Sequence, residues 1–430
     1  MTFYQRYVLE EFCSMYDIEM ATIQELINQK RLQLTDKSGS FFSSENVRPE
    51  LLTWINCLDR QIPVLFTDNN DLPVIEIRND SVCLNFDIIG SAFYFLSGWQ
   101  EIKSTVRDTH GRYPFKESLQ YELNITEIPV VNYYFHILKD ALQKALGTQF
   151  ALRKHIPNAI QVCLSHDIDK INSGWLEGGF SELKKGSYGS AFSLLLNKLF
   201  GKDPWDNISE ILALELTLNV PSTFFFLPSK GNGNADYRIN QVLPSFEEII
   251  AVKSEVALHG SLGSAHSSDN LNKEIDQFSK KIQGNRFHFL KYEPRTVGTT
   301  LDAVNIRYDG SFGFAEHVGF RHGVCHPFHP FNPDTSTRHS FLEIPLSIMD
   351  TTLSFASYML HDEQKNSKVD RVISEAEKFN GIVSILWHNN YFSNYKYTGW
   401  KDRYIQLVTR LKNKNAIFYT HESLADIYNA

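Results

Sequence analysis

Two neighbouring carboxylates are the residues of this chain best suited to chemistry. In the segment CLSHDID (163–169), Asp167 and Asp169 follow apolar residues directly and stand two positions apart. If the segment ends a buried strand, residues two apart project to the same side. Two acids at a strand end suit a metal ligand paired with a general base. The same pair would also fit an Asp-rich turn that closes a strand.

Polar residues also end other apolar stretches of the chain. His259 lies in ALHGS, Arg286 and His288 lie in NRFHF, and His388 follows ILW. Because the active site of a parallel barrel gathers at the carboxyl ends of its strands, we expect these side chains to converge. Asp169, His259 and His288 would then bind one divalent metal and leave a position open for water, as in catalytic zinc sites.

The remaining two polar side chains have predicted roles in proton transfer. Arg286 stands two positions before His288, hence on the same face of an extended strand, where its guanidinium would hold Asp167. Asp167 would act as general base, and His388 would deliver a proton to the leaving group. A single histidine after a strand is more often structural, so the prediction depends on the polar strand ends occurring together.

The order of these motifs resembles the polysaccharide deacetylase (NodB homology) family over about residues 158–430. SHDID, LHGS, NRFHF and ILWHN occupy the places of that family's Asp-x-Asp, His-containing, Arg-bearing and Leu-x-x-His motifs. The runs YDGSFGFAEHVGFRHGVCHPFHPF (308–331) and LEIPLSIMDTTL (342–353) resemble a bacterial subgroup with an extra N-terminal domain, and FYFLSGWQE and RDTHGRYPFKES resemble that domain. The resemblance implies a metal-dependent de-N-acetylase acting on an N-acetylated carbohydrate, with zinc, or else cobalt or nickel, as the metal.

The second motif departs from the family pattern. That motif usually has two histidines four positions apart, but Gly263 stands four positions after His259. His266, seven positions on, is poorly spaced, so we take His288 as the third ligand and His266 as the fallback. The missing histidine also suits a noncatalytic carbohydrate-binding relative. A third alternative is a metal-dependent hydrolase of another amide or an ester.

Aromatic and basic residues near the motifs are candidates for substrate binding. Trp387 and Tyr391 flank His388 and would stack on a sugar ring, although Trp387 fits a core strand equally well. In the run 308–331, we expect a long loop near the mouth of the site, and the candidates for substrate contact are Arg321, His322 and His326. A second metal among the histidines of this run is disfavoured, because it has one cysteine and two interrupting prolines.

Alternating strand and helix patterns predict the elements that position these residues. The alternation predicts a (β/α) barrel over residues 156–430 and an N-terminal α+β domain over residues 1–155. The resemblance implies that the barrel is the distorted one of the polysaccharide deacetylase type. The segment 182–199 is predicted as an inserted helical excursion, and the charges of the loop 107–114 as solvated. The expected barrel strands are 160–164, 222–227, 255–258, 285–289, 306–308, 341–344, 381–387 and 416–419.

Composition narrows the class of protein and its partners. The chain has 42 basic and 50 acidic residues, a formal charge of −8, which argues against a nucleic-acid partner. Its five cysteines include no CxxC pair and suggest reduced thiols, and no stretch resembles a signal peptide or a membrane span. We therefore expect a cytoplasmic protein. The sequence leaves the oligomeric state open.

Overall fold

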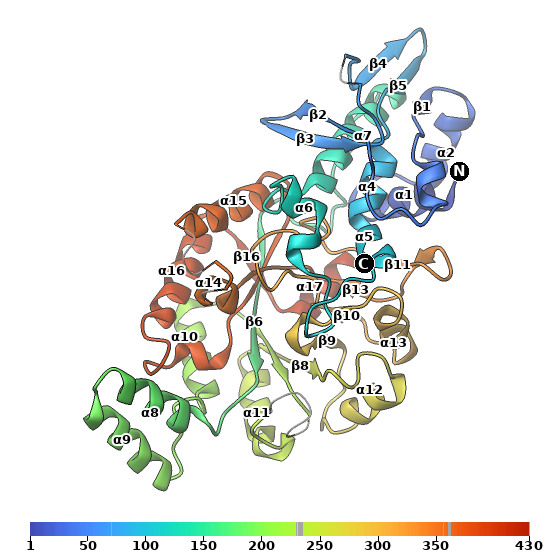
Figure 1. The fold of residues 1–430 in the computed structure, drawn as a ribbon. Coiled ribbons are helices and arrows are strands. Elements are labelled where there is room, and N and C mark those ends of the chain that lie inside the picture. Colours follow the sequence, from blue (N-terminus) through green and yellow to red (C-terminus); the bar gives the residue numbers. More distant parts are fainter. Residues whose placement is uncertain (70, 229, 231–234, 356, 360–362, 430) are drawn as a thin grey trace.

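The computed structural model describes residues 1–69, 71–228, 230, 235–355, 357–359 and 363–429. A curved parallel sheet surrounded by helices forms its larger part, and a smaller N-terminal part lies against one side of it (Figure 1). The strands of the curved sheet are β6 (Gln161–Ile168), β7 (Thr223–Phe226), β8 (Glu255–Gly260), β9 (Gly284–Phe287), β10 (Tyr308–Asp309), β13 (Leu342–Glu343), β14 (Leu346–Met349), β15 (Ile382–Leu386) and β16 (Ile417–Tyr419).

The order of the strands shows that this sheet is a distorted barrel. Neighbouring strands run β13-β10-β9-β8-β7-β6-β15-β14, and β16 pairs with the first residues of β6. All of these pairs are parallel. The two edge strands, β13 and β14, are separated by only two residues, Ile344 and Pro345. Since two residues span less than about 10 Å, both edges must lie close together, and the predicted (β/α) barrel is confirmed.

Helices cover the outside of the barrel, which explains why its strands are apolar on both faces. The run Phe224-Phe225-Phe226 in β7, for example, is buried throughout. On α15, Val369, Val372, Ile373 and Ala376 recur at helical spacing and are buried. The helices of this part are α10 (Ile208–Leu218), α11 (Leu243–Ala251), α12 (Ser268–Ile275), α13 (Val297–Ala303), α14 (Asp350–Ser354), α15 (Lys365–Lys378), α16 (Trp400–Asn413) and α17 (His421–Tyr428). Short elements complete it: β11 (Phe331–Asn332), β12 (Thr337–Arg338), η2 (Ile239–Gln241), η3 (His288–Leu290) and η4 (Asn389–Phe392).

The N-terminal part is a mixed α and β unit, as predicted. A three-stranded sheet in the order β1-β5-β4 and an antiparallel hairpin of β2 and β3 pack around α1, α4 and α7. The hairpin was not predicted from the sequence. The elements are α1 (Phe3–Met15), α2 (Met20–Asn28), β1 (Leu32–Leu34), α3 (Gly39–Phe42), β2 (Leu52–Cys57), β3 (Arg60–Leu65), β4 (Ile75–Arg78), β5 (Ser81–Leu84), α4 (Ile88–Leu96), α5 (Trp99–Lys103), η1 (Phe115–Glu117), α6 (Leu119–Glu122) and α7 (Val130–Leu146).

The hydrophobic core is continuous between the two parts. One cluster of buried apolar side chains includes Phe93 of α4 and Val131 of α7 together with Phe328 and Val383 of the barrel part. The division into domains at residues 155 and 156 stays a prediction.

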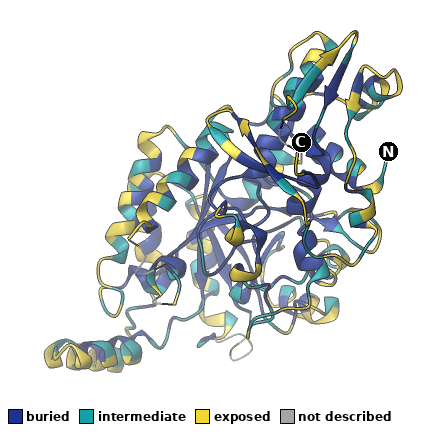
Figure 2. Ribbon diagram, turned by 45° about the horizontal axis from the view of Figure 1, so that its top comes forward, coloured by how far each residue is buried: buried dark blue, intermediate teal, exposed yellow. Residues whose placement is uncertain are grey.

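A helical hairpin leaves the barrel after β6. It consists of α8 (Gly174–Lys184) and α9 (Tyr188–Leu199), and it extends away from the rest of the molecule (Figures 1 and 2). The predicted excursion 182–199 begins too late, because the hairpin already starts with α8 at Gly174. The chain turns back at Gly186, whose φ of 77° suits glycine. No helix in the described part of the chain is both long enough and apolar enough to cross a bilayer.

Candidate metal centre

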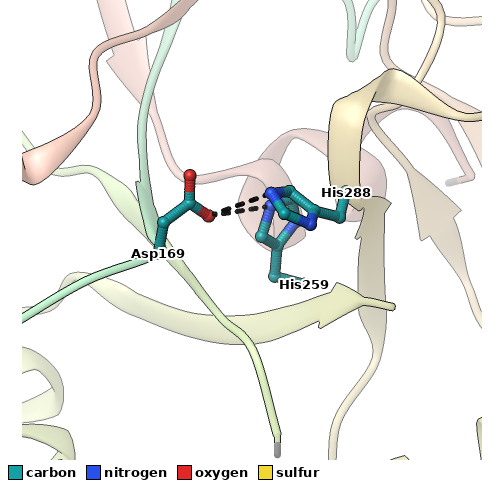
Figure 3. A group of neighbouring side chains, drawn as sticks. All are labelled: Asp169, His259 and His288. Atoms are coloured by element: carbon teal, nitrogen blue, oxygen red, sulfur yellow. Dashed lines mark ion pairs between the residues drawn. The ribbon is translucent and has the colours of Figure 1, made fainter. Parts of the chain in front are cut away.

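Three strands bring the predicted metal ligands together at one rim of the barrel. Asp169 directly follows β6, His259 lies near the end of β8, and His288 directly follows β9. Because β6, β8 and β9 are parallel strands of one sheet, with β7 between β6 and β8, their carboxyl ends meet at the same rim. Figure 3 shows the carboxylate of Asp169 facing both imidazole rings.

The spacing of the three side chains suits a tetrahedral cation. Asp169 Oδ1 lies 3.5 Å from Nε2 of His259 and 3.6 Å from Nε2 of His288. All three ligand atoms lie within 4.8 Å of one another. Atoms bound at about 2.0–2.1 Å to a tetrahedral zinc ion lie roughly 3.4 Å apart. Two imidazoles and a carboxylate, set at this distance, are therefore a donor set that zinc accepts.

Hydrogen bonding leaves the ligand atoms of this group available. Nδ1 of His259 donates to the carbonyl oxygen of Arg286 at 2.7 Å, which directs the lone pair of Nε2 toward Asp169. Among the described residues, Asp169 Oδ1 and His259 Nε2 are buried and have no hydrogen-bond partner. Buried polar atoms without a partner are costly, so these two atoms make the group a candidate site for a cation.

The electrostatics keep the carboxylate in the form a ligand needs. Burial raises the pKa of Asp169, but the charge of His288 and the close approach of the His259 and His288 rings, at 3.5 and 3.6 Å, outweigh burial and hold this pKa well below its usual value. Asp169 is therefore ionised, as a metal ligand must be.

A buried arginine fixes Asp167 beside the ligand group. Nη1 of Arg286 donates to Asp167 Oδ1 at 2.9 Å and to Ser165 Oγ at 2.8 Å, and Nε donates to the carbonyl oxygen of Gly310 at 2.9 Å. The other carboxylate oxygen of Asp167 lies 3.6 Å from Nε2 of His259. Asp167 thus lies beside, but outside, the group of Asp169, His259 and His288.

His388 approaches the ligands from another strand and is held by an acid that the sequence analysis missed. Nδ1 of His388 lies 2.8 Å from Asp350 Oδ1, and Nε2 lies 3.9 Å from Asp169 Oδ2. Burial lowers the pKa of His388, but the negative charges of Asp350, Asp169 and Asp167 raise it to about 10. Asp350 directly follows the apolar strand β14, which is the same signal that identified Asp167 and Asp169.

These side chains open into a pocket of about 570 Å³. This volume lies within the range of small-molecule sites. Of the two aromatic candidates for sugar stacking, Tyr391 lines the pocket. Trp387 does not line it, because its indole is buried in the core and packs against the rings of Trp400 and Tyr404. Trp387 is therefore a core residue.

The predicted loop residues Arg321, His322 and His326 do not line this pocket, which corrects the expectation that they bind substrate. Arg321 is buried and donates to Glu101 of α5, with Nε 2.8 Å from Oε1. His322 lies against the same carboxylate at 3.7 Å, and Nδ1 of His326 lies 2.8 Å from the Asn132 side-chain nitrogen. The run 308–331 is mostly buried, and its backbone bonds to Thr126 and Val131 of the N-terminal part. Its Ala315 lines the pocket, but the run forms no exposed loop there.

The fallback ligand His266 lies apart from the metal group. Its ring is bound at 2.6 Å to the hydroxyl of Thr296. Asp169 and His259 form their group with His288. This geometry favours His288 as the third ligand.

A loop of the N-terminal part supports the turn that carries His288, which corrects the expectation of solvated charges at 107–114. Arg112 is buried, pairs with Asp108, and donates from Nη1 to the carbonyl oxygen of Phe289 at 3.1 Å. The ring of His110 stacks on Phe289 at 4.4 Å, and Phe289 stacks on His288 at 4.0 Å. Both His110 and Arg112 line the pocket.

The supported turn has a costly backbone conformation. Phe289 and Leu290 have φ values of 60° and 56°, in the left-handed region that side chains other than glycine disfavour. Each such residue costs of order 1–3 kcal/mol and persists only where its surroundings impose it. The loop 107–112 supplies part of that constraint.

Comparisons with known proteins yield one family model and several distant structures. Residues 4–147 match a family described as a family of unknown function (DUF7033). No curated protein matches the chain. Among solved structures, a protein from Mycobacterium smegmatis assigned as a polysaccharide deacetylase is 14% identical, with a TM-score of 0.41, and the match covers 63% of this chain and 90% of that one.

Two further structures resemble the chain to a similar degree. A protein from Pseudomonas aeruginosa PAO1 with the same assignment is 15% identical, with a TM-score of 0.40 and coverage of 63% and 92%. A pseudoenzyme of the CE4 family from Bacillus anthracis is 13% identical, with a TM-score of 0.32 and coverage of 63% and 67%. At such values, only the geometry of the site itself supports an argument about function. That geometry defines a (β/α)-barrel protein with a candidate centre for a divalent cation.

Proposed function

We propose that this chain is a metal-dependent hydrolase that removes the acetyl group from the nitrogen of an N-acetylated carbohydrate. The observation that carries the proposal is the convergence of Asp169, His259 and His288 at the pocket. A candidate base, Asp167, and a candidate acid, His388, face this group from neighbouring strands. Hydrolysis of an acetamide needs these components together.

Asp167 and His388 carry out the two proton transfers of the proposed reaction. A divalent cation held by the three ligands supplies the polarisation of the acyl oxygen and the activation of water. Asp167 accepts the proton of the attacking water, and Arg286 holds its carboxylate in place. His388 stays protonated beside Asp350 and donates to the departing nitrogen. Each general acid or base step contributes roughly a hundredfold to ten-thousandfold in rate.

The substrate class rests on the motifs and on the pocket. SHDID, LHGS, NRFHF and ILWHN resemble those of carbohydrate de-N-acetylases. Tyr391, Phe355 and Tyr358 are aromatic residues among those that line the pocket, and aromatic side chains suit the apolar face of a sugar ring. Zinc is the proposed metal, and cobalt or nickel would accept the same ligands.

The test is acetate release from N-acetylated sugars by the zinc-loaded protein. We expect release that a chelator abolishes and added zinc restores. A zinc-loaded protein that releases acetate only from O-acetyl esters or non-sugar amides would instead be another metal-dependent hydrolase. Binding of sugars without any release would identify a noncatalytic relative, the candidate that Gly263 favours because it stands in place of a histidine.

Replacing Asp350 tests the proposed acid. In Asp350→Asn, the pKa of His388 falls from about 10, because its largest raising influence is the Asp350 charge. His388 must be protonated to donate, so the alkaline limb of the pH–rate profile should move to lower pH and the rate at pH 8 should fall about tenfold or more. The matched control is Asp302→Asn, since Asp302 binds His339 in the same way at 2.7 Å. An unchanged alkaline limb contradicts the assignment.

The loop 107–112 should contribute to metal affinity. His110→Ala and Arg112→Gln each remove a contact to Phe289, which stacks on His288. Supporting partners of metal ligands typically affect affinity by 10–100-fold, and we expect about tenfold for each variant in zinc titration by calorimetry. His136→Ala on α7 is the control, because His136 does not line this pocket. If both loop variants bound zinc as tightly as the wild type, the loop would shape the pocket but would not support the metal site.

A further inference from the structure

The hairpin of α8 and α9 exposes apolar stripes at helical spacing. On α9, apolar residues recur at positions i, i+4, i+7, i+8 and i+11, a pattern that normally turns toward a core. Here they face solvent: Phe192 is 60% exposed and Leu199 is 75% exposed. The exposed large apolar residues of the hairpin are Leu176, Phe180, Leu183, Tyr188, Phe192, Leu195, Leu196, Leu199 and Phe200.

Contacts elsewhere on the hairpin leave these stripes uncovered. The two helices pack on each other where Gly178 allows close approach to the buried Leu194. Glu177 of α8 pairs with Lys170 and Lys396, both at 2.7 Å. The hairpin is therefore anchored to the barrel through its first helix, while its apolar stripes stay free to meet a partner (Figure 2). Apolar surfaces of this kind mark interaction sites.

The charge of the hairpin indicates the chemistry of that partner. Residues 174–202 include four lysines and two glutamates, a formal charge of +2 in a chain whose total is −8. Lys184 and Lys185 lie at the turn between the helices, Lys198 lies in the last turn of α9, and Lys202 follows that helix. Lys185 binds Glu182 and Lys198 binds Asp203, so Lys184 and Lys202 are the lysines most available to a partner. Leucine and phenylalanine stripes combined with lysines are typical of helices that lie in the interface of an anionic membrane.

The length of the two helices determines whether the hairpin could span a membrane or lie on its surface. With 11 and 12 residues, α8 and α9 are shorter than the roughly 20 residues that span a bilayer. We propose that the α8–α9 hairpin docks on anionic lipid membranes, with its apolar side chains at the boundary between headgroups and acyl chains. Lys170 and Lys396, which Glu177 binds, line the pocket. The base of the docked hairpin therefore lies beside the pocket, because Glu177 itself lines it.

Vesicle flotation of the full chain tests the proposal without any need for turnover. We expect binding to phosphatidylglycerol–phosphatidylcholine vesicles and much weaker binding to phosphatidylcholine alone. The triple variant Phe192→Ser, Leu199→Ser, Phe200→Ser should bind at least about 100-fold more weakly, since each lost apolar side chain accounts for roughly tenfold. Lys184→Gln and Lys202→Gln should each weaken binding to the anionic vesicles about fivefold.

The matched control removes exposed apolar side chains from the N-terminal part. Leu58→Ser, Leu72→Ser, Ile77→Ser alters side chains of comparable exposure, 54%, 44% and 63%, and should bind vesicles normally. Light scattering identifies the competing occupant. The wild type could form a dimer and bind no vesicles, while the hairpin triple variant stays monomeric. In that case the stripes bind a second copy of the chain, and the proposal is overturned. Vesicle binding that survives the hairpin triple variant would overturn it as well.

Discussion

Asp167→Asn should abolish hydrolysis and leave the metal bound. Asparagine has nearly the same shape as aspartate and its Oδ1 still accepts from Arg286 Nη1, which lies 2.9 Å from that oxygen in the native protein. An amide cannot take a proton from water, however, so the base step is lost. We expect the rate to fall between about a hundredfold and ten-thousandfold.

The metal content of Asp167→Asn shows whether this variant has lost a general base or a metal ligand. Asp167 is not one of the three ligands, so zinc bound per chain, measured by elemental analysis, should match the wild type. Asp302→Asn is again the control for a generic loss of an aspartate. Near-normal acetate release by Asp167→Asn would remove this residue from the base role.

His288→Ala should lose zinc, whereas His266→Ala should keep it. Among the described residues, His288 joins Asp169 and His259 in one group, whereas His266 binds Thr296. Because loss of a mere supporting partner weakens metal binding 10–100-fold, loss of a ligand should weaken it by more than about 100-fold. Calorimetric titration of the metal-free variants measures both affinities.

This pair of variants also tests the departure of the second motif from the family pattern. With Gly263 in place of a histidine, a three-ligand site depends on the residue after β9. If His288→Ala bound zinc like the wild type and His266→Ala did not, the third ligand would be His266.

The residues at the ends of the longer strands could be predicted from the sequence. Asp167, Asp169, His259 and His388 each lie in or just after a strand of at least five residues. Such strands are recognisable from their apolar runs alone. The parallel arrangement of strands then implies that their carboxyl ends meet, which is why a barrel and a site at its rim were predicted together.

Contacts between distant segments could not be predicted in this way. Asp350 was missed because β14 follows β13 after two residues, too few for the helix that normally separates parallel strands. The buried position of Arg321 depends on Glu101, 220 positions earlier, and the support of Phe289 by Arg112 joins residues 177 positions apart. Such pairings leave no periodic signal in the sequence.

The pairing of Arg321 with Glu101 has a consequence for the integrity of the whole molecule. Both side chains are buried, and they join the barrel part to the N-terminal part. Removing one member of a buried ion pair typically costs 3–5 kcal/mol, a large share of the 5–15 kcal/mol that separates folded from unfolded states. A barrel cut free of the first 155 residues would lose the Glu101 carboxylate that binds this guanidinium, and it would expose the apolar surface that the N-terminal part covers. The two parts should therefore depend on each other for stability, and they should unfold on heating in a single cooperative transition.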